Sequence, residues 1–86
     1  MDLISVIVLN YNGRELLDGC LSSLASQTYS PFEVVLVDNG SSDGSPEYIQ
    51  AQYPWVRLVR NRDNLGFAGG TNAGIRAAKG RYILTL

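Results

Sequence analysis

Histidine is absent from the 86-residue sequence, and cysteine occurs only once. Without histidine, the chain lacks the most common general base and a frequent metal ligand. The single thiol, Cys20, excludes an internal disulfide and a multi-thiolate metal site. Because Cys20 lies beside Leu17, Leu21 and Leu24, we predict that it is a small residue of the core.

Long hydrophobic runs are also absent. The first apolar segment, residues 3–9, is too short to span a bilayer, and no basic segment typical of a signal peptide precedes it. We therefore expect a cytoplasmic chain without a membrane segment, and we allow for membrane association in a longer parent protein.

Basic residues are scarce in the first part of the chain. Only Arg14 is basic before Trp55, whereas the other six Lys and Arg residues follow it. The net charge of −1 argues against a nucleic-acid or membrane-surface binder, so we expect no nucleic-acid partner. With 45% hydrophobic and 17% charged residues, the composition is that of one small globular domain.

Four short runs rich in β-branched and aliphatic residues predict strands at 3–9, 32–38, 55–60 and 81–86. The first two runs are almost continuously apolar. Such runs are typical of strands that are covered on both faces, as in a parallel sheet with helices above and below.

Helical patterns fill the three connections. Leucines and Cys20 recur at helical spacing over about 14–27, with Asn12 and Glu15 spaced as a capping box. Ser45 is the expected cap of a second, short helix that ends before Pro54. A third helix is expected from about Phe67 to Ala78, with Gly80 as its C-terminal cap.

The element order is therefore β-α-β-α-β-α-β. It predicts an α/β, Rossmann-like, doubly wound parallel sheet with strand order 3-2-1-4. In such sheets, ligands bind at the carboxyl ends of the strands. Those ends are residues 10–13, 38–41 and 61–64.

The last predicted strand ends with the chain at Leu86. We interpret the chain as the N-terminal portion of a longer protein. If the strand at 81–86 is an edge of the sheet, its unpaired backbone groups favour pairing with a second copy, which makes a homodimer possible.

Residues 40–44 fit the pattern G-x-S-x-G, but a hydrolase function is disfavoured. A nucleophilic Ser42 requires a neighbouring base, and no histidine is present to supply one. Residues 69–75 have glycines spaced as in a Walker A loop, yet Ile75 stands where lysine is required. No G-x-G-x-x-G motif follows the first strand.

Two strand-end residues have a functional and a structural interpretation. Asp38, with Asn39 behind it, can accept hydrogen bonds from a ribose hydroxyl or a base N–H, or it can form a local Asx turn. Tyr11 can stack on a base, or it can cover the rim of the sheet.

Glycines are concentrated at the start of the third helix, within residues 64–74. This pattern indicates close approach of the backbone to a ligand or to the sheet. A helix N-terminus with Arg76 nearby favours a diphosphate, whereas the alternative is tight packing on the sheet with Arg76 in solvent.

Four motifs occur in register along the chain: ISVIVLNYNG, the L-x-S-L-x-S-Q-T-Y stretch at 21–29, FEVVLVDNGSSDGS and NLGFAGGTNAGI. Together they resemble the N-terminal nucleotide-binding half of inverting family 2 glycosyltransferases with the GT-A fold. The last motif resembles the rhamnosyltransferase-like branch. The resemblance implies that residues 1–86 are the nucleotide-sugar-binding half of a truncated GT-A domain.

The resemblance also implies a nucleotide-diphosphate sugar donor, UDP- or dTDP-linked, that lies across the strand ends. Its base pocket would be lined by the residues after the first strand, and Asp38 with Asn39 would contact the base or ribose. The third helix and its loop would lie beside the ribose and diphosphate. The implied donor-binding residues are Asn10, Tyr11, Asn12, Asp38, Asn39, Asn64, Gly66, Phe67, Asn72 and Arg76.

The family uses Mg²⁺ or Mn²⁺ held by an Asp-x-Asp-like motif, which would begin just beyond Leu86. We therefore expect no catalytic or metal-binding residue in this chain, and we expect the chain alone to be inactive. The parent protein would transfer a sugar with inversion to a glycan or lipid-linked acceptor, in the synthesis of cell-surface polysaccharide.

Two other functions stay open. One is a non-catalytic α/β module that self-associates through the edge strand at 81–86. The other is a different nucleotide-binding transferase, such as a nucleotidylyltransferase. That enzyme would require a basic phosphate loop after the first strand, which residues 10–13 do not provide.

Overall fold

The computed structural model describes residues 3–26 and 31–86. Within them lies a sheet of four parallel strands in the order β3-β2-β1-β4, which confirms the predicted topology. The strands are β1 (Ile4–Asn10), β2 (Phe32–Asn39), β3 (Arg57–Asn61) and β4 (Tyr82–Thr85).

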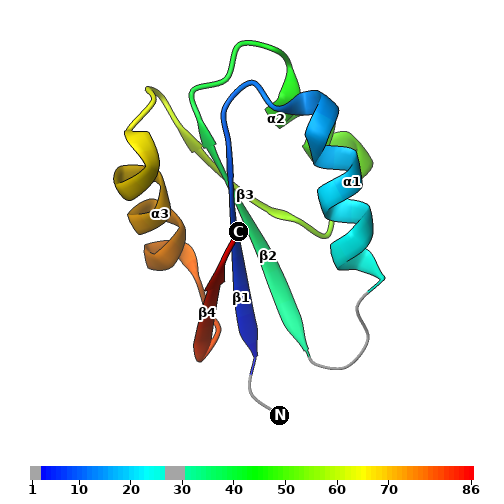
Figure 1. Ribbon diagram of the computed structural model, residues 1–86, viewed down its shortest axis with the longest axis vertical. Helices are drawn as coiled ribbons and strands as arrows, with labels where there is room; N and C mark the ends of the chain where they lie inside the picture. The colour runs from blue at the N-terminus through cyan, green and yellow to red at the C-terminus, as the bar shows by residue number, and fades with distance from the viewer. Residues whose placement is uncertain (1–2, 27–30) are drawn as a thin grey trace.

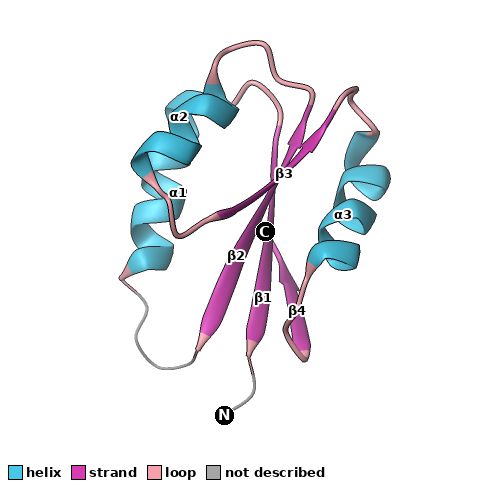
Figure 2. Cartoon of the chain, turned by 180° about the vertical axis from the view of Figure 1, so that it is seen from behind, coloured by secondary structure: helices cyan, strands magenta, loops and turns pink. Residues whose placement is uncertain are grey.

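Three helices connect the strands and cover both faces of the sheet, which confirms the α/β class. Helices α1 and α2 lie on one face and α3 lies on the other (Figures 1 and 2). The helices are α1 (Arg14–Ala25), α2 (Ser45–Gln52) and α3 (Gly66–Ala77).

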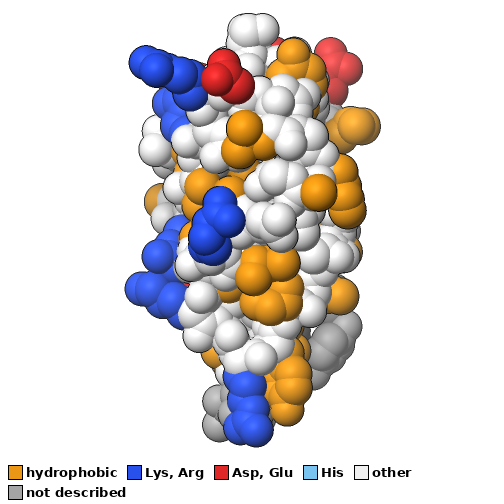
Figure 3. Space-filling model, turned by 90° about the vertical axis from the view of Figure 1, so that its left-hand side faces the viewer, with side chains coloured by type: hydrophobic (Ala, Val, Ile, Leu, Met, Phe, Trp, Pro, Cys, Tyr) orange, Lys and Arg blue, Asp and Glu red, His pale blue; other side chains and the backbone are white. Residues whose placement is uncertain are grey.

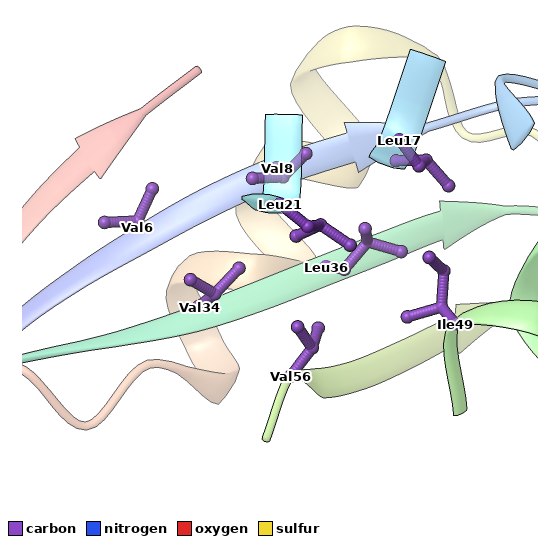
Figure 4. Close-up of a cluster of buried hydrophobic side chains, with 8 residues drawn as sticks. All are labelled: Val6, Val8, Leu17, Leu21, Val34, Leu36, Ile49 and Val56. Atoms are coloured by element: carbon purple, nitrogen blue, oxygen red, sulfur yellow. The ribbon is translucent and has the colours of Figure 1, made fainter. Parts of the chain in front are cut away.

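Alternate side chains of the two central strands form two separate cores. On the α1 and α2 face, side chains from both strands and both helices converge on one another (Figure 4). On the α3 face, the smaller core consists of Ile7, Val35 and Val37. A side chain on one face of a strand is followed by one on the other, so a strand buried on both faces is apolar along most of its length.

Glycines let α3 lie close to the sheet. A Cβ atom added at Gly74 would lie 2.6 Å from Ile7 Cγ2 and 2.9 Å from Val37 Cγ2. One added at Gly70 would lie 2.7 Å from Asn39 Nδ2. Tight packing of the helix on the sheet therefore explains why these two positions of the glycine-rich motif are glycine.

The predicted starts of the first two helices are wrong in detail. Asn12 and Glu15 form no capping box, because Gly13 is the N-cap residue of α1 and Asn12 has a left-handed backbone with φ 52°. Ser45 is the first residue of α2 instead of its cap, and Gly44 precedes it with φ 81°.

The end of α3 also differs from the prediction. The helix ends at Ala77, whose carbonyl accepts a hydrogen bond of 2.7 Å from Arg57 Nη1. Gly80 is not its cap; the Gly80 N–H donates instead to Ser5 Oγ at 2.8 Å. The predicted end of the first helix, Gln27, lies outside the described residues, and α1 ends at Ala25.

Two side chains of α1 differ in burial. Leu16 is 79% exposed, although its spacing placed it with the core leucines, because it lies beside the buried Leu17 on the helix and points to another side. Cys20 is partly buried and packs against the larger core, which confirms its prediction as a core residue.

Candidate functional site

The carboxyl ends of β1, β2 and β3 place three loops at one edge of the molecule (Figure 1). The loops consist of residues 11–13, 40–44 and 62–65. Parallel strands bring all their carboxyl ends to the same edge, so three segments that are distant in the sequence meet there.

A buried polar pair joins the ends of β1 and β2. Asn10 and Asp38 are register partners, and only 4% and 1% of their respective surfaces are exposed. Asn10 Nδ2 donates to Asp38 Oδ1 at 2.8 Å and to Ser45 Oγ at 2.8 Å, while Asn10 Oδ1 accepts the Gly13 N–H at 3.0 Å. This single amide connects both strand ends to the starts of α1 and α2.

The carboxylate of Asp38 is occupied by groups of the chain itself. Besides Asn10, it accepts the backbone N–H of Ser41 at 2.9 Å and the Ser41 hydroxyl at 2.7 Å. The hydrogen bond from the Ser41 backbone is the contact expected if Asp38 forms a local Asx turn. Direct contact between Asp38 and a nucleotide stays a prediction.

Asn12 joins the first loop to the second. Its backbone N–H donates to Ser41 Oγ at 2.8 Å, and its Oδ1 accepts the N–H of Ser42 at 2.8 Å. Ser42 is exposed, and its sequence context contains no histidine that could act as a base. The structure therefore uses Ser42 as a turn residue.

Asp43 binds the starts of two helices. Its Oδ2 accepts the Arg14 N–H at 3.2 Å, and its Oδ1 accepts the Ser45 N–H at 3.0 Å and the Ser45 hydroxyl. The Ser45 hydroxyl holds the pKa of Asp43 below its ordinary value, so the carboxylate is charged at neutral pH.

Side-chain amides join β2, β3 and the start of α3. Asn61 Nδ2 donates to Asn39 Oδ1 at 2.9 Å, and Asn39 Nδ2 donates to the Gly66 carbonyl at 3.1 Å. The Gly66 N–H donates to Asn64 Oδ1 at 2.8 Å, and Gly66 has φ 75°, a conformation that favours glycine. Asn61 was absent from the predicted site residues, although it directly follows the third predicted strand, 55–60.

Two aromatic side chains stand exposed on or beside this edge. Tyr11, directly after β1, is 55% exposed, and Phe67, in the first turn of α3, is 73% exposed. Both rings are accessible to a ligand. Tyr11 also lines a hollow of about 310 Å³ with apolar residues that include Leu86.

The structure does not bring every predicted residue to the edge. Asn72 lies on an exposed part of α3, six positions after Gly66, and Arg76 lies in the last turn of that helix. Gly66 and Arg76 are ten positions apart on the helix, which corresponds to about 15 Å along the axis. Arg76 therefore lies toward the amino ends of the strands.

Two guanidinium groups at the end of β3 lie nearer to the carboxyl-end edge of the sheet than Arg76 does. A hollow of about 280 Å³ is lined by Asp38, Gly40, Ser41, Arg60, Asn61 and Arg62. Arg60 forms an ion pair of 2.9 Å with Glu47, and Arg62 is exposed. The sequence predicts the anion-binding guanidinium at Arg76, whereas these two guanidinium groups lie nearer the edge, and Arg62 directly follows β3.

The described residues do not fit a divalent metal. Residues 3–26 and 31–86 contain no group of three or more Cys, Asp or Glu side chains that could hold an ion. Of the carboxylates at the edge, Asp38 and Asp43 are bound to different hydroxyl and N–H donors of the chain, and Asp63 is exposed.

Comparison with known proteins defines the class. The family model described as "Glycosyl transferase family 2" matches residues 5–86. The chain belongs to this family, as its four motifs predict.

Individual members of known glycosyltransferase groups resemble this chain in sequence and in fold. An N-acetylglucosaminyl-diphospho-decaprenol L-rhamnosyltransferase of Mycobacterium tuberculosis is 38% identical over 71 residues, which cover 83% of this chain and 23% of that protein. The mannosyltransferase PcManGT from Pyrobaculum calidifontis, solved with GDP-Man and Mn²⁺, has a TM-score of 0.83 and 31% identity over 93% of this chain and 25% of its own. S. aureus TarS in complex with UDP-GlcNAc has a TM-score of 0.88 and 28% identity over 100% of this chain and 26% of its own.

The likeness to solved glycosyltransferases confirms the predicted fold. The chain spans about a quarter of the length of the curated relatives that it matches. In the part of the chain that the structure describes, no helix combines the length and apolar character needed to cross a membrane.

Proposed function

We propose that this chain is the nucleotide-binding part of the donor site in a longer glycosyltransferase. That protein transfers a sugar from a nucleotide-diphosphate sugar, UDP- or dTDP-linked, to a glycan or lipid-linked acceptor, with inversion. The observation that carries the proposal is the meeting of three motif-bearing loops, after β1, β2 and β3, at one edge of a family 2 domain.

The chemistry of this edge supports a nucleotide. Tyr11 offers an exposed ring for a base, the amides of Asn12 and Asn64 offer hydrogen bonds, and Arg62 offers positive charge for a diphosphate. Asn10 and Asp38 act within the protein, where they hold the loops in place. Solved relatives carry GDP-Man with Mn²⁺ or UDP-GlcNAc, which agrees with a nucleotide-sugar partner.

The remaining parts of the reaction belong to the longer protein in this proposal. The ligands of Mg²⁺ or Mn²⁺, the catalytic base and the acceptor site lie in chain that follows β4. The 86-residue chain by itself therefore binds nucleotide without turning over a donor. Its site of action is the cytoplasm, where nucleotide sugars are the substrates.

The test is a titration of the 15N-labelled 86-residue chain with UDP and with dTDP, followed by amide chemical shifts. We expect shifts at residues 10–13, 38–44 and 61–67. Tyr11→Ala should weaken binding about tenfold, equivalent to roughly 1.4 kcal/mol, because it removes a stacking surface. Lys79→Gln, at the opposite end of the sheet, is the control and should bind as the wild type does.

Shifts confined to the amino ends of the strands, or no shift at millimolar nucleotide, would contradict this proposal. Release of free UDP from UDP-sugar by the purified chain would contradict the separate claim that the chain alone is inactive.

A second candidate function is self-association through β4. The β3 edge of the sheet carries Arg57 and Arg60, and charged side chains of this kind protect an edge strand from pairing. By contrast, β4 carries Ile83 and Leu84, which are 41% and 50% exposed. This apolar, unprotected edge favours pairing with a second copy.

A further inference from the structure

Asn39 and Asn61 occupy the last paired positions of β2 and β3. The parallel register places them directly beside each other, and Asn39 is only 5% exposed. Asn61 donates a hydrogen bond to Asn39, and Asn39 in turn donates one to the carbonyl of Gly66, the first residue of α3. Two strand ends and a helix start are therefore joined by one line of hydrogen bonds.

The Gly66 carbonyl determines which group donates and which accepts in each of these hydrogen bonds. The Gly66 carbonyl can only accept, so Asn39 must turn its NH₂ group toward it at 3.1 Å. The Oδ1 atom of Asn39 then lies on the other side of the amide, where it needs a donor. Asn61 Nδ2 supplies that donor at 2.9 Å. Asn61 is thus the group that satisfies the Oδ1 atom of Asn39 in the amide orientation that Gly66 requires, and it stabilises that orientation.

The orientation of Asn39 matters because α3 begins against it. A Cβ atom at Gly70 would lie 2.7 Å from Asn39 Nδ2, so the backbone of the helix packs directly against this amide. The turn from Asn64 to Gly66 leads into the same helix and carries proposed ribose and diphosphate contacts. A preorganised loop loses less conformational freedom when a ligand binds.

We propose that Asn61 is a positioning residue of the nucleotide site. By donating to Asn39, it fixes the amide that holds the Gly66 carbonyl, and so it fixes the start of α3 beside the strand ends. The inference rests on the proposed nucleotide-binding function and names a residue that the family-derived site residues do not include.

The test compares two side chains of nearly the same shape as asparagine. The carboxylate of Asn61→Asp can only accept, so it attracts the NH₂ group of Asn39. If the Asn39 amide turns toward it, Asn39 Oδ1 faces the Gly66 carbonyl oxygen, and the hydrogen bond to Gly66 is lost. Asn61→Leu neither donates nor accepts, so Asn39 keeps its bond to Gly66 but loses its restraint. Gln50→Glu, on the exposed surface of α2, repeats the change from amide to carboxylate as a control.

The first measurement is made without ligand. The side-chain NH₂ resonances of Asn39 and the backbone amides of Gly66 and Phe67 should move in Asn61→Asp, move less in Asn61→Leu and stay unchanged in Gln50→Glu. If Asn61 only filled space, both isosteric variants would match the wild type. Wild-type resonances at Asn39 and Gly66 in Asn61→Asp would overturn the proposal.

The second measurement is the dissociation constant for UDP. We expect it to rise about three- to tenfold in Asn61→Asp and about two- to threefold in Asn61→Leu, the range for one lost hydrogen bond. The titration is repeated at about 0.5 M salt, which screens the added charge. Asn61→Asp is then expected to stay weaker than Gln50→Glu.

The outcomes separate the two claims. If the wild-type chain binds neither UDP nor dTDP, the proposed function fails and this inference fails with it. If the wild type binds and both Asn61 variants bind equally well, only the inference is overturned. Asn61→Leu keeps the test decisive if Asn61→Asp fails to fold, because a branched apolar residue is compatible with a strand end.

Discussion

At the scale of single residues, the carboxylate of Asp38 works inside the protein. Three donors surround it, two from Ser41 and one from Asn10, and almost none of its surface reaches solvent. Removing an acceptor from such a buried set leaves donors without partners, which costs more than the net contribution of a hydrogen bond. Asp38 thereby shapes the β2–α2 loop on which a nucleotide would rest.

Asp38→Asn should lower the free energy of unfolding by about 1–3 kcal/mol, because its new NH₂ group faces a donor. Urea denaturation followed by circular dichroism measures the change. Asp63→Asn, the same substitution at an exposed position, should stay within about 0.5 kcal/mol of the wild type. If Asp38→Asn weakened nucleotide binding without loss of stability, Asp38 would be a ligand contact instead.

At the scale of elements, α3 depends on its glycines and α1 does not. Gly74 faces Ile7 and Val37 in the smaller core, whereas a Cβ atom added at Gly19 of α1 would meet nothing within 4 Å. Glycine weakens a helix wherever it occurs, but of these two positions only Gly74 has close packing that offsets the cost.

The two glycines should therefore respond oppositely to alanine. Gly19→Ala should raise the free energy of unfolding by about 0.5–1 kcal/mol through helix propensity alone. Gly74→Ala should lower it by about 1–3 kcal/mol, because the added methyl group overpacks the core beneath α3. Thermal and urea unfolding of both variants provide the measurement. An increase in stability for Gly74→Ala would show that α3 can move away from the sheet.

At the scale of the whole molecule, exposed apolar side chains gather on the side that carries α3 and β4 (Figure 3). Positive side chains lie among them on this view. The large exposed hydrophobic residues of these two elements are Phe67, Ile75, Tyr82, Ile83 and Leu84. If a second copy pairs with the sheet, it should do so at β4, where backbone groups as well as side chains are available.

Sedimentation velocity of the 86-residue chain over micromolar to millimolar concentrations tests this pairing. We expect a concentration-dependent dimer in the wild type and a monomer in Leu84→Lys, because a lysine on an edge strand opposes pairing. Ile75→Lys, the matched change on α3, should leave the dimer intact. A monomeric wild type would remove the second candidate function, and loss of the dimer in Ile75→Lys alone would move the contact to α3.

Much of the fold could be predicted because its pattern is local. The apolar runs that became β1 and β2 have to be continuous, since both of their faces are covered. The alternation of strands with helical patterns then leaves few right-handed arrangements, of which 3-2-1-4 was expected and found. Helix boundaries were less predictable, because Gly13 and Gly44 precede the helices where side-chain caps were expected.

The sequence by itself determined the class of the sheet, the family and the three loops that form the candidate site. Only the tertiary structure decided which polar groups those loops expose. Asn10 and Asp38 lie 28 positions apart, and their hydrogen bond exists because the β1–β2 register aligns them. The β2–β3 register likewise brings Asn61 to Asn39, whereas the length of α3 carries Arg76 away from the edge. The register of the strands and the direction in which α3 runs are set when the sheet and its helices assemble, so a local sequence pattern does not reveal them.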